Sequence, residues 1–337
     1  MEIKENYDLT KLNTFGVVSH AKFFTEINNE FDIKEVLNSK HFKNSSKLFL
    51  GSGSNILFTK DFEGIVILNK LKGIEILEEN SEYVLVKSMS GEIWHELVMF
   101  IVNNGFWGVE NLSFVPGTVG AAPVQNIGAY GVELKNILES VDALNIDTGE
   151  IRIFKNTECE FGYRDSIFKN KFKNKYFITA ITLKLKKNPD PKLGYPILAE
   201  FLLKNKIEPT SPKIISEAII QIRKSKLPDP KVIGNAGSFF KNVFITKQKL
   251  KELQKLNPDI PFFDKSEKIK IPTGWLIEQC GWKGYRDKNV GVHEKQALVI
   301  VNYGGATGLE IVALTERIKA SILQKFGLSI DIEVNLV

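Results

Sequence analysis

The chain has 337 residues and a formal net charge of +5; 43% of its residues are hydrophobic and 25% are charged. These proportions are typical of a soluble globular protein, and the length predicts two or three domains, because one hydrophobic core rarely serves so many residues. An apolar run of about 18 residues is absent and the N-terminus is charged, which argues against membrane insertion and a signal peptide and favours a cytoplasmic location. The two cysteines and four scattered histidines lack ligand spacing, so we predict neither a disulfide framework nor a metal site.

The first half of the chain alternates predicted strands and helices. Strands are expected over 21–27, 47–50 and 83–87, and helices over 34–37 and 93–103. Asp147-Thr148-Gly149 stands between two apolar segments, 141–146 and 150–154, and predicts a hairpin, which a long strand over 176–185 follows. The two prolines of 188–191 can neither continue a helix nor donate to a strand ladder, so a domain boundary or an insertion is expected there.

The second half begins with a helix signal. Ser211 precedes Pro212, and apolar residues recur at helical spacing from Ile214 to Ile222, which predicts a helix with a serine N-cap. Arg223 and Lys224 fall near its end, where we expect them to complement the helix dipole. Thr307-Gly308-Leu309-Glu310 fits a capping box that opens a helix ending at Gly327, and a last strand is predicted over 329–336.

One loop carries an unusual concentration of polar groups. Residues 234–242, Gly-Asn-Ala-Gly-Ser-Phe-Phe-Lys-Asn, hold the hydroxyl of Ser238, two amides and one ammonium on a backbone that its glycines allow to turn. Each buried polar group left without a partner costs about 1–3 kcal/mol, so packing alone does not favour such a segment. The loop therefore predicts a functional site, with a simple glycine-rich turn as the alternative.

Two other loops are rich in small residues. Gly51-Ser52-Gly53-Ser54-Asn55 follows an apolar strand, and its backbone N–H groups can approach a phosphate closely. It is not a dinucleotide fingerprint, because Ile56 stands where a third glycine is required, and no segment fits the phosphate loop that ends in Gly-Lys-Ser/Thr. Residues 116–131 hold four glycines and no charge, which suits contact between backbone and a flat or extended ligand.

These loops, together with 13–15, 161–166, 226–230 and 274–279, resemble the UDP-N-acetylenolpyruvoylglucosamine reductase (MurB) family. Their order and spacing extend from about residue 13 to the last predicted strand. The resemblance implies an α+β protein with a two-subdomain FAD-binding unit of the PCMH/vanillyl-alcohol-oxidase type and a C-terminal α/β substrate-binding domain. The limits it implies are 1–70 and 71–212 for the FAD-binding subdomains, with a substrate-loop insertion near 188–210, then 213–325 for the substrate-binding domain and 326–337 for a C-terminal strand.

The resemblance also implies the cofactors. FAD would lie against the glycine-rich turns and would be bound noncovalently, because neither turn contains a histidine that could attach it. NADPH would be the hydride donor. The implied FAD-binding residues are Gly51, Ser52, Gly53, Ser54, Asn55, Ile56, Pro116, Gly117, Thr118, Gly120, Ala121, Gln125, Asn126, Gly128, Ala129, Tyr130 and Gly131.

The implied reaction is the reduction of the enolpyruvyl ether of UDP-N-acetylglucosamine to its lactyl ether, UDP-N-acetylmuramate, in peptidoglycan precursor synthesis. Ser238 would give a proton to the α-carbon, while Arg164 and Glu333 would bind and polarise the substrate carboxylate. Substrate-binding residues would be Tyr195, Lys226, Asn242 and Gln296. The chain departs from the family pattern at its end, where Asp331 replaces a common glutamate and a longer basic-aromatic tail is absent.

Alternatives remain at this point. An oxidase or dehydrogenase of the same flavin fold could act on another substrate, and a noncatalytic nucleotide-sugar-binding protein could keep the loops without the acid. Ser238 could simply cap a turn, and Glu333 could face outward from its strand. The lysines of 169–175 favour a solvated loop over a nucleic-acid surface. We therefore expect small-molecule substrates, no nucleic acid and a monomer.

Overall fold

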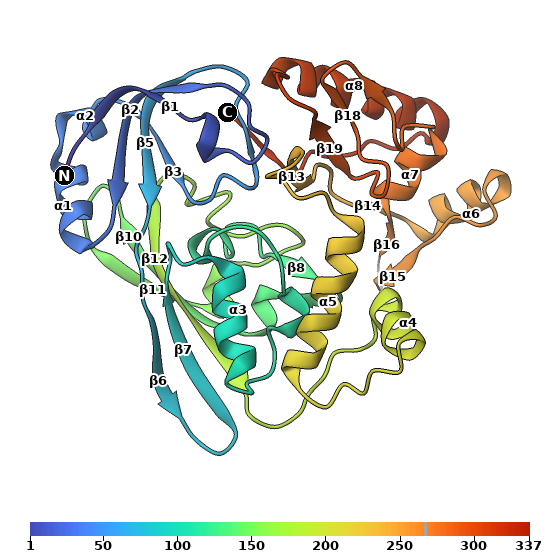
Figure 1. Cartoon of the computed structure of the whole chain (residues 1–337), viewed down its shortest axis with the longest axis horizontal. Coiled ribbons are helices and arrows are strands. Elements are labelled where there is room, and N and C mark those ends of the chain that lie inside the picture. Colours follow the sequence, from blue (N-terminus) through green and yellow to red (C-terminus); the bar gives the residue numbers. More distant parts are fainter. Residues whose placement is uncertain (266–267) are drawn as a thin grey trace. The chain divides into compact units, whose positions relative to one another are not determined.

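The computed structural model describes residues 1–265 and 268–337, and the chain forms two compact units (Figure 1). The first unit consists of Met1–Tyr7, Ala21–Ser52 and Phe62–Ser225, and the second of Asp8–His20, Gly53–Asp61 and Lys226–Val337. Neither unit is one continuous stretch of sequence. The domain limits inferred from the sequence stay predictions.

The first unit starts with a sheet of order β1-β2-β5-β3, in which β2, β5 and β3 run parallel. Its helices pack apolar side chains such as Ile33, Val36 and Phe42 against Ile65 and Ile67 of the central strand. That strand is buried from Gly64 onward, as a parallel strand covered on both faces should be. The elements are β1 (Lys4–Asp8), β2 (His20–Ile27), α1 (Glu30–Asn38), α2 (Lys40–Lys43), β3 (Ser46–Leu50) and β5 (Phe62–Asn69).

A second, antiparallel sheet of order β11-β10-β12-β7-β6 completes this unit. Helix α3 places Trp94, Leu97 and Ile101 in the same core as Val86 and Ile181 of the sheet. The elements are β6 (Ile74–Glu79), β7 (Tyr83–Met89), α3 (Trp94–Asn103), β8 (Gly128–Ala129), β9 (Val132–Glu133), β10 (Leu138–Asn145), β11 (Ile151–Lys155) and β12 (Tyr176–Lys186), with 3₁₀ turns η2 (Glu110–Leu112), η3 (Val119–Ala121), η4 (Leu134–Asn136) and η5 (Asn156–Cys159).

Two helices follow this sheet in the sequence and share a smaller core. Helix α4 (Pro196–Lys204) lies in the segment after the double proline, and α5 (Pro212–Lys226) crosses the sequence limit between the two units. Their apolar faces meet around the buried Trp107, with Tyr130 and Tyr195 at the margin of the cluster. The apolar cluster therefore joins the insertion to the loop at 116–131.

All three separate stretches of the second unit contribute to a shared core, in which Phe15 and Leu57 pack with residues from Ala236 to Val334. Its sheets have orders β13-β19-β18-β17 and β14-β16-β15, and β20 runs parallel to β4. The elements are η1 (Thr10–Leu12), β4 (Ile56–Leu57), β13 (Gly234–Ser238), β14 (Val243–Ile245), α6 (Lys247–Leu256), β15 (Phe263–Lys265), β16 (Lys268–Ile271), α7 (Thr273–Gln279), β17 (Arg286–Asp287), β18 (Val290–Val292), β19 (Val299–Asn302), α8 (Gly308–Phe326) and β20 (Asn335–Leu336).

Most sequence-predicted elements are present, and one is wrong. The hairpin at Asp147–Gly149 and the capping box of Thr307 and Glu310 are confirmed, and Gly327 ends α8 with a φ of 61°. The strand expected over 329–336 is reduced to Asn335–Leu336 and one bridge from Ile332 to Phe240. The segment changes partners along its length, from the Ser238 loop to β4, so a continuous ladder cannot form.

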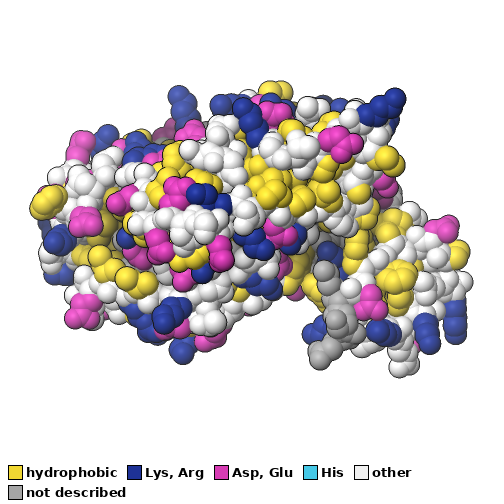
Figure 2. Space-filling model, turned by 90° about the horizontal axis from the view of Figure 1, so that it is seen from below, with side chains coloured by type: hydrophobic (Ala, Val, Ile, Leu, Met, Phe, Trp, Pro, Cys, Tyr) yellow, Lys and Arg dark blue, Asp and Glu magenta, His cyan; other side chains and the backbone are white. Residues whose placement is uncertain are grey.

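Two further observations concern membrane insertion and surface charge. Within the described residues, none of the helices has the length and apolar character needed to cross a membrane. On the face in Figure 2, Lys and Arg side chains are interspersed with Asp and Glu side chains. That face therefore has a mixed charge and not a continuous basic surface.

Candidate functional site

The loop at Gly51 lies directly against the loop at Thr118, and there is no room for a side chain between them. A Cβ atom on Gly51 would lie 2.4 Å from Thr118 Oγ1. Next to it, the hydroxyl oxygen of Ser52 is buried and has no hydrogen-bond partner among the described residues. An unpaired buried hydroxyl costs about 1–3 kcal/mol, so this arrangement fits a site whose ligand supplies the missing hydrogen bond.

The loop at 116–131 is fixed to the strand-to-helix turn that precedes α3. The N–H of Gly120 donates to the carbonyl of Ser90 at 2.8 Å, and the N–H of Trp94 donates to the carbonyl of Gly117 at 3.0 Å. A Cβ on Gly120 would lie 2.6 Å from that of Ser90, so glycine permits this close approach. The backbone of the loop is therefore rigidly placed by α3 and β7.

Arg164 stands in a tight turn that is bound to the same loop by three hydrogen bonds. Arg164 Nη2 donates to the carbonyl of Gly128 at 2.9 Å, Asn126 Nδ2 donates to that of Gly162 at 2.9 Å, and Ser166 Oγ donates to that of Val124 at 2.7 Å. These hydrogen bonds hold the guanidinium against the glycine-rich loop, although Arg164 and Gly128 are 36 residues apart in the sequence.

Backbone strain gathers in this region of the first unit. Asn126, Tyr130 and Arg164 have φ values of 44°, 47° and 55°, which lie in the left-handed region that side chains with a Cβ avoid. Such conformations persist where the surrounding structure over-determines them, and they cluster at functional sites. All three residues were singled out from the sequence.

Tyr195 meets Tyr130 edge to face, with 5.3 Å between the ring centroids. Tyr195 precedes α4, and Pro196 occupies the first position of the helix, so the tyrosine is held where the helix begins. Burial raises the pKa of both tyrosines, so both hydroxyls stay protonated at neutral pH. The insertion thus places its tyrosine on the glycine-rich loop.

Arg223 has a contact that the sequence did not predict. Its Nε donates to the carbonyl of Phe114 at 3.1 Å, and its guanidinium lies close enough to Tyr130 to affect the pKa of the phenol. Burial lowers the pKa of Arg223, and the charge of nearby Arg164 lowers it further. The expected complementation of the helix dipole does not include these tertiary contacts. The sequence signal for them is the position of a charged residue at the end of the amphipathic stripe, where its side chain can be partly buried.

In the second unit, Thr14 connects two of the loops. Its N–H donates to the carbonyl of Gly53 at 3.1 Å, and its carbonyl accepts the N–H of Asn235 at 3.0 Å. A Cβ on Gly234 would lie 2.2 Å from the carbonyl oxygen of Phe15. The short motif at 13–15 therefore ties the glycine-rich turn to the loop that carries Ser238.

Ser238 and Glu333 lie on neighbouring segments. Ser238 ends β13, and the next residue, Phe239, accepts the N–H of Glu333 at its carbonyl at 2.8 Å. Lys241 donates its N–H to the carbonyl of Asp331 at 2.9 Å, so the two segments run side by side through both residues. Both Ser238 and Glu333 are half-buried.

Asn242 and Gln296 belong to the same region. Asn242 Oδ1 accepts the N–H of Thr273, the first residue of α7, at 3.1 Å. Gln296 Oε1 would lie 3.4 Å from a Cβ on Gly274, and Leu298 accepts the N–H of Phe239 at 2.8 Å. The structure thus brings Ser238, Asn242, Gln296 and Glu333 together in the second unit, whereas half-buried Lys226 ends α5.

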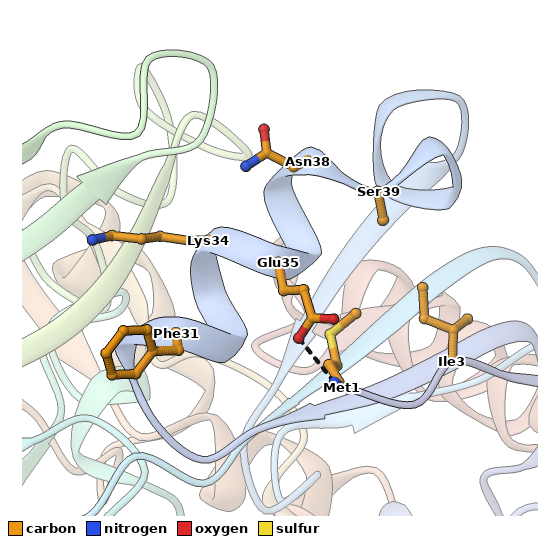
Figure 3. A pocket seen from close by; sticks show the side chains of 7 residues that line it. All are labelled: Met1, Ile3, Phe31, Lys34, Glu35, Asn38 and Ser39. Carbon is orange, nitrogen blue, oxygen red and sulfur yellow. Dashed lines mark hydrogen bonds and ion pairs between the residues drawn. The ribbon is translucent and has the colours of Figure 1, made fainter.

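A shallow pocket beside α1 contains none of the predicted site residues (Figure 3). The N-terminal amine of Met1 pairs there with Glu35 at 2.8 Å. Elsewhere, the described residues include no cluster of three His, Cys, Asp or Glu side chains that could hold a metal ion. We assign no role to this pocket.

Comparison with known proteins gives the chain a family. Residues 229–337 match the model of the UDP-N-acetylenolpyruvoylglucosamine reductase C-terminal domain, and residues 21–155 match an FAD binding domain. The UDP-N-acetylenolpyruvoylglucosamine reductase of Flavobacterium johnsoniae is 47% identical over 100% of both chains, and that of Amoebophilus asiaticus is 46% identical over 100% of both. The chain belongs to the UDP-N-acetylenolpyruvoylglucosamine reductase family.

A crystal structure of the MurB family, from Thermus caldophilus, has the same fold. It matches with a TM-score of 0.66 and 22% identity, covering 99% of this chain and 98% of that one. The resemblance found in the sequence and the α+β fold with its flavin-binding unit are therefore confirmed. The chain is an FAD-dependent oxidoreductase of the MurB family, whose members serve cell-wall peptidoglycan synthesis. The roles of individual residues stay predictions.

Proposed function

We propose that this chain catalyses the NADPH-dependent reduction of UDP-N-acetylglucosamine enolpyruvate to UDP-N-acetylmuramate. The observation that carries the proposal is the full-length identity of 47% to a reductase of that name. The grouping of Ser238, Asn242, Gln296 and Glu333 in the second unit gives it further support. As parts of the same proposal, the protein acts in the cytoplasm as a monomer.

The glycine-rich loops would hold FAD without a covalent bond. Gly51 packs against Thr118 and Gly120 against Ser90, so these glycines let the loops lie close together, and the buried Ser52 hydroxyl lacks a partner among the described residues. Residues 116–131 carry no charge, so N–H groups of the backbone would meet the pyrophosphate. The chemistry that bound FAD supplies is hydride transfer, from NADPH to the β-carbon of the enolpyruvyl group.

Arg164 would bind the substrate carboxylate. A guanidinium is bidentate towards a carboxylate and stabilises the negative charge that develops when the β-carbon accepts a hydride. The hydrogen bond from Arg164 to Gly128 and the strained turn hold the guanidinium in one orientation. Preorganisation of this kind avoids the cost of reorienting the charge during the reaction.

Ser238 would deliver the proton to the α-carbon. A free serine is a poor acid, so the loop must stabilise the alkoxide, and Lys241 and Asn242 bring an ammonium and an amide within four residues of it. Glu333, on the segment beside Ser238, would help to polarise the substrate carboxylate. Tyr195, Lys226, Asn242 and Gln296 would hold the nucleotide-sugar.

The test is the visible absorbance of the purified protein, followed anaerobically as NADPH and then the enolpyruvyl substrate are added. We expect NADPH to bleach the flavin and the substrate to restore it. Ser238→Ala should bleach normally but recover at least about 100-fold more slowly, because it lacks only the proton donor. Normal recovery in that variant would remove Ser238 as the acid; bleaching without recovery in the unaltered protein would overturn the substrate.

A further inference from the structure

Asn111 is a fully buried amide that joins two loops of the first unit. It lies in the 3₁₀ turn η2, and its exposed fraction is 0%. Its Nδ2 donates to the carbonyl of Tyr130 at 2.8 Å and to the carbonyl of Lys192 at 2.9 Å. Tyr130 belongs to the glycine-rich loop, and Lys192 belongs to the insertion, three residues before Tyr195.

The direction of these hydrogen bonds is fixed by chemistry. Both partners are backbone carbonyl oxygens, which only accept, so the amide nitrogen must face them. Both N–H groups are used, whereas Oδ1 is buried with no hydrogen-bond partner among the described residues. A residue that served packing alone would not keep a buried acceptor unpaired, because an apolar side chain avoids that cost.

The two carbonyls bound by Asn111 lie close in sequence to Tyr130 and Tyr195, the two tyrosines whose rings are in contact. Tyr130 holds a strained φ of 47°, and its ring meets that of Tyr195 at 5.3 Å. Both rings pack on the apolar cluster around Trp107, which contains Leu198 of α4. An apolar cluster is non-directional, so it holds the insertion near the loop without fixing its register. The two hydrogen bonds of Asn111 supply that register.

We infer that Asn111 is a positioning residue that fixes the tyrosine-bearing insertion to the flavin-binding loop and so aims the Tyr195 hydroxyl. The inference rests on the proposed function, in which Tyr195 binds the nucleotide-sugar and Tyr130 lies beside the flavin. Asn111 itself is fully buried, so the proposal gives it no contact with either ligand. Its removal should therefore weaken substrate binding through Tyr195 and spare flavin reduction.

The first experiment is a double-mutant cycle on KM. Asn111→Ala should raise KM for the enolpyruvyl substrate about tenfold and leave the rate of flavin reduction by NADPH within about twofold, where tenfold corresponds to about 1.4 kcal/mol. In a Tyr195→Phe background, Asn111→Ala should raise KM by less than about twofold, because the hydroxyl it positions is gone. Equal factors in both backgrounds would overturn the inference.

A matched control separates positioning from loss of stability. Ser216 also makes a buried polar contact in this region, because a hydrogen bond of 2.7 Å joins its Oγ to that of Ser113, but among the described residues it has no hydrogen bond to either loop carbonyl. Ser216→Ala should leave KM within about twofold. If Asn111→Ala does not fold, Asn111→Ser, which keeps one donor, should give a smaller rise in KM with the same dependence on Tyr195.

The second experiment does not need turnover. In the flavin-loaded protein, Asn111→Ala should accelerate tryptic cleavage after Lys192 about tenfold, whereas Ser216→Ala should not. Unchanged cleavage would overturn the positioning role even if the proposed reaction were correct. Conversely, accelerated cleavage in a protein that fails to turn over the enolpyruvyl substrate would keep the positioning role and reject only the substrate.

Discussion

Arg164, which we propose binds the substrate carboxylate, has an unfavourable backbone conformation. Its φ of 55° costs a residue with a Cβ about 1–2 kcal/mol relative to glycine. The turn keeps this conformation because Gly162 and Asp165 pair across it at 3.0 Å. The guanidinium is thus held on the Gly128 carbonyl at the expense of local stability.

This conflict predicts that activity and stability separate at Arg164. Arg164→Gly and Arg164→Ala should both lower kcat at least about 100-fold, because each removes the charge that, in the proposed mechanism, stabilises the developing carbanion. Arg164→Gly should nevertheless be more stable than Arg164→Ala by about 1 kcal/mol, since glycine adopts this φ freely. Thermal unfolding of the two variants, with flavin absorbance as a check on folding, measures the difference; equal midpoints would contradict the account of strain.

Gly51 packs against Thr118 of the second glycine-rich loop. In Gly51→Ala the new Cβ would meet Thr118 Oγ1 at 2.4 Å, so one loop must move. We expect FAD affinity to fall by roughly tenfold, which corresponds to about 1.4 kcal/mol. Gly194→Ala is the control, because a Cβ there meets nothing within 4 Å. FAD titration of both refolded apoproteins would decide, and equal affinities would rule out the steric argument.

Among the elements, α8 depends on its cap. Thr307 Oγ1 accepts the N–H of Glu310 at 3.2 Å, and Glu310 Oε2 accepts that of Thr307 at 2.8 Å. Thr307→Ala should destabilise the second unit by about 1 kcal/mol, whereas Thr307→Ser should cost much less, because its hydroxyl still caps. Urea unfolding would measure the change in stability, with the fluorescence of Trp282 as the probe, because Trp282 donates a hydrogen bond to Ser321 of α8. Equal loss in both variants would show that the hydroxyl is not the stabilising group.

The same helix indicates which features the sequence could predict. Its start, its end and the hairpin at Asp147–Gly149 depend on residues within a few positions of one another, so local patterns were sufficient. The contacts of Asn111 reach 19 and 81 residues along the chain, and no local pattern carries them. The candidate loops were found from composition, but the connection of Gly53 to Asn235 through Thr14 required the structure.

Elements buried by distant partners were also missed. The parallel strand β5 between β2 and β3 has an unbroken apolar stretch without a helical or alternating period, and α4 lies in a segment that was expected only as an insertion. The final strand was overestimated because its pattern predicts extended backbone but not its partners. Tertiary pairing decided each of these cases.

At the scale of the whole molecule, a buried carboxyl group makes stability depend on pH. Glu110 is 0% exposed, and its Oε2 accepts the N–H of Gly108 at 2.6 Å. Burial raises the pKa of Glu110, and the backbone N–H groups of Glu110 and Gly108, which favour the carboxylate, oppose this shift only in part; nearby Asp190 adds to the rise and Lys192 opposes it. The folded protein therefore binds this proton more readily than the unfolded chain, and the stabilisation is lost as the pH rises through the raised pKa.

Replacement of Glu110 should reveal this dependence. In Glu110→Gln, the thermal midpoint relative to the unaltered protein should rise as the pH increases above the ordinary pKa of a glutamate, because the variant has no carboxylate to ionise while its amide oxygen can accept from Gly108. Glu217→Gln, at an exposed position of α5, is the matched control substitution. A difference that stays constant with pH in Glu110→Gln would indicate that the ionisation of Glu110 does not differ between folded and unfolded chains.

The order in which the chain is synthesised has a consequence for the second unit. Its early stretches, Asp8–His20 and Gly53–Asp61, are made long before their partners, and Thr59 donates its N–H and its hydroxyl to the carbonyl of Val337, 278 residues later. During translation, Phe15 and Leu57 must therefore stay outside their final core until the ribosome has passed α8. The first unit can complete its sheets earlier, so a nascent chain should carry a finished sheet and an exposed apolar loop together, a species that a chaperone would recognise.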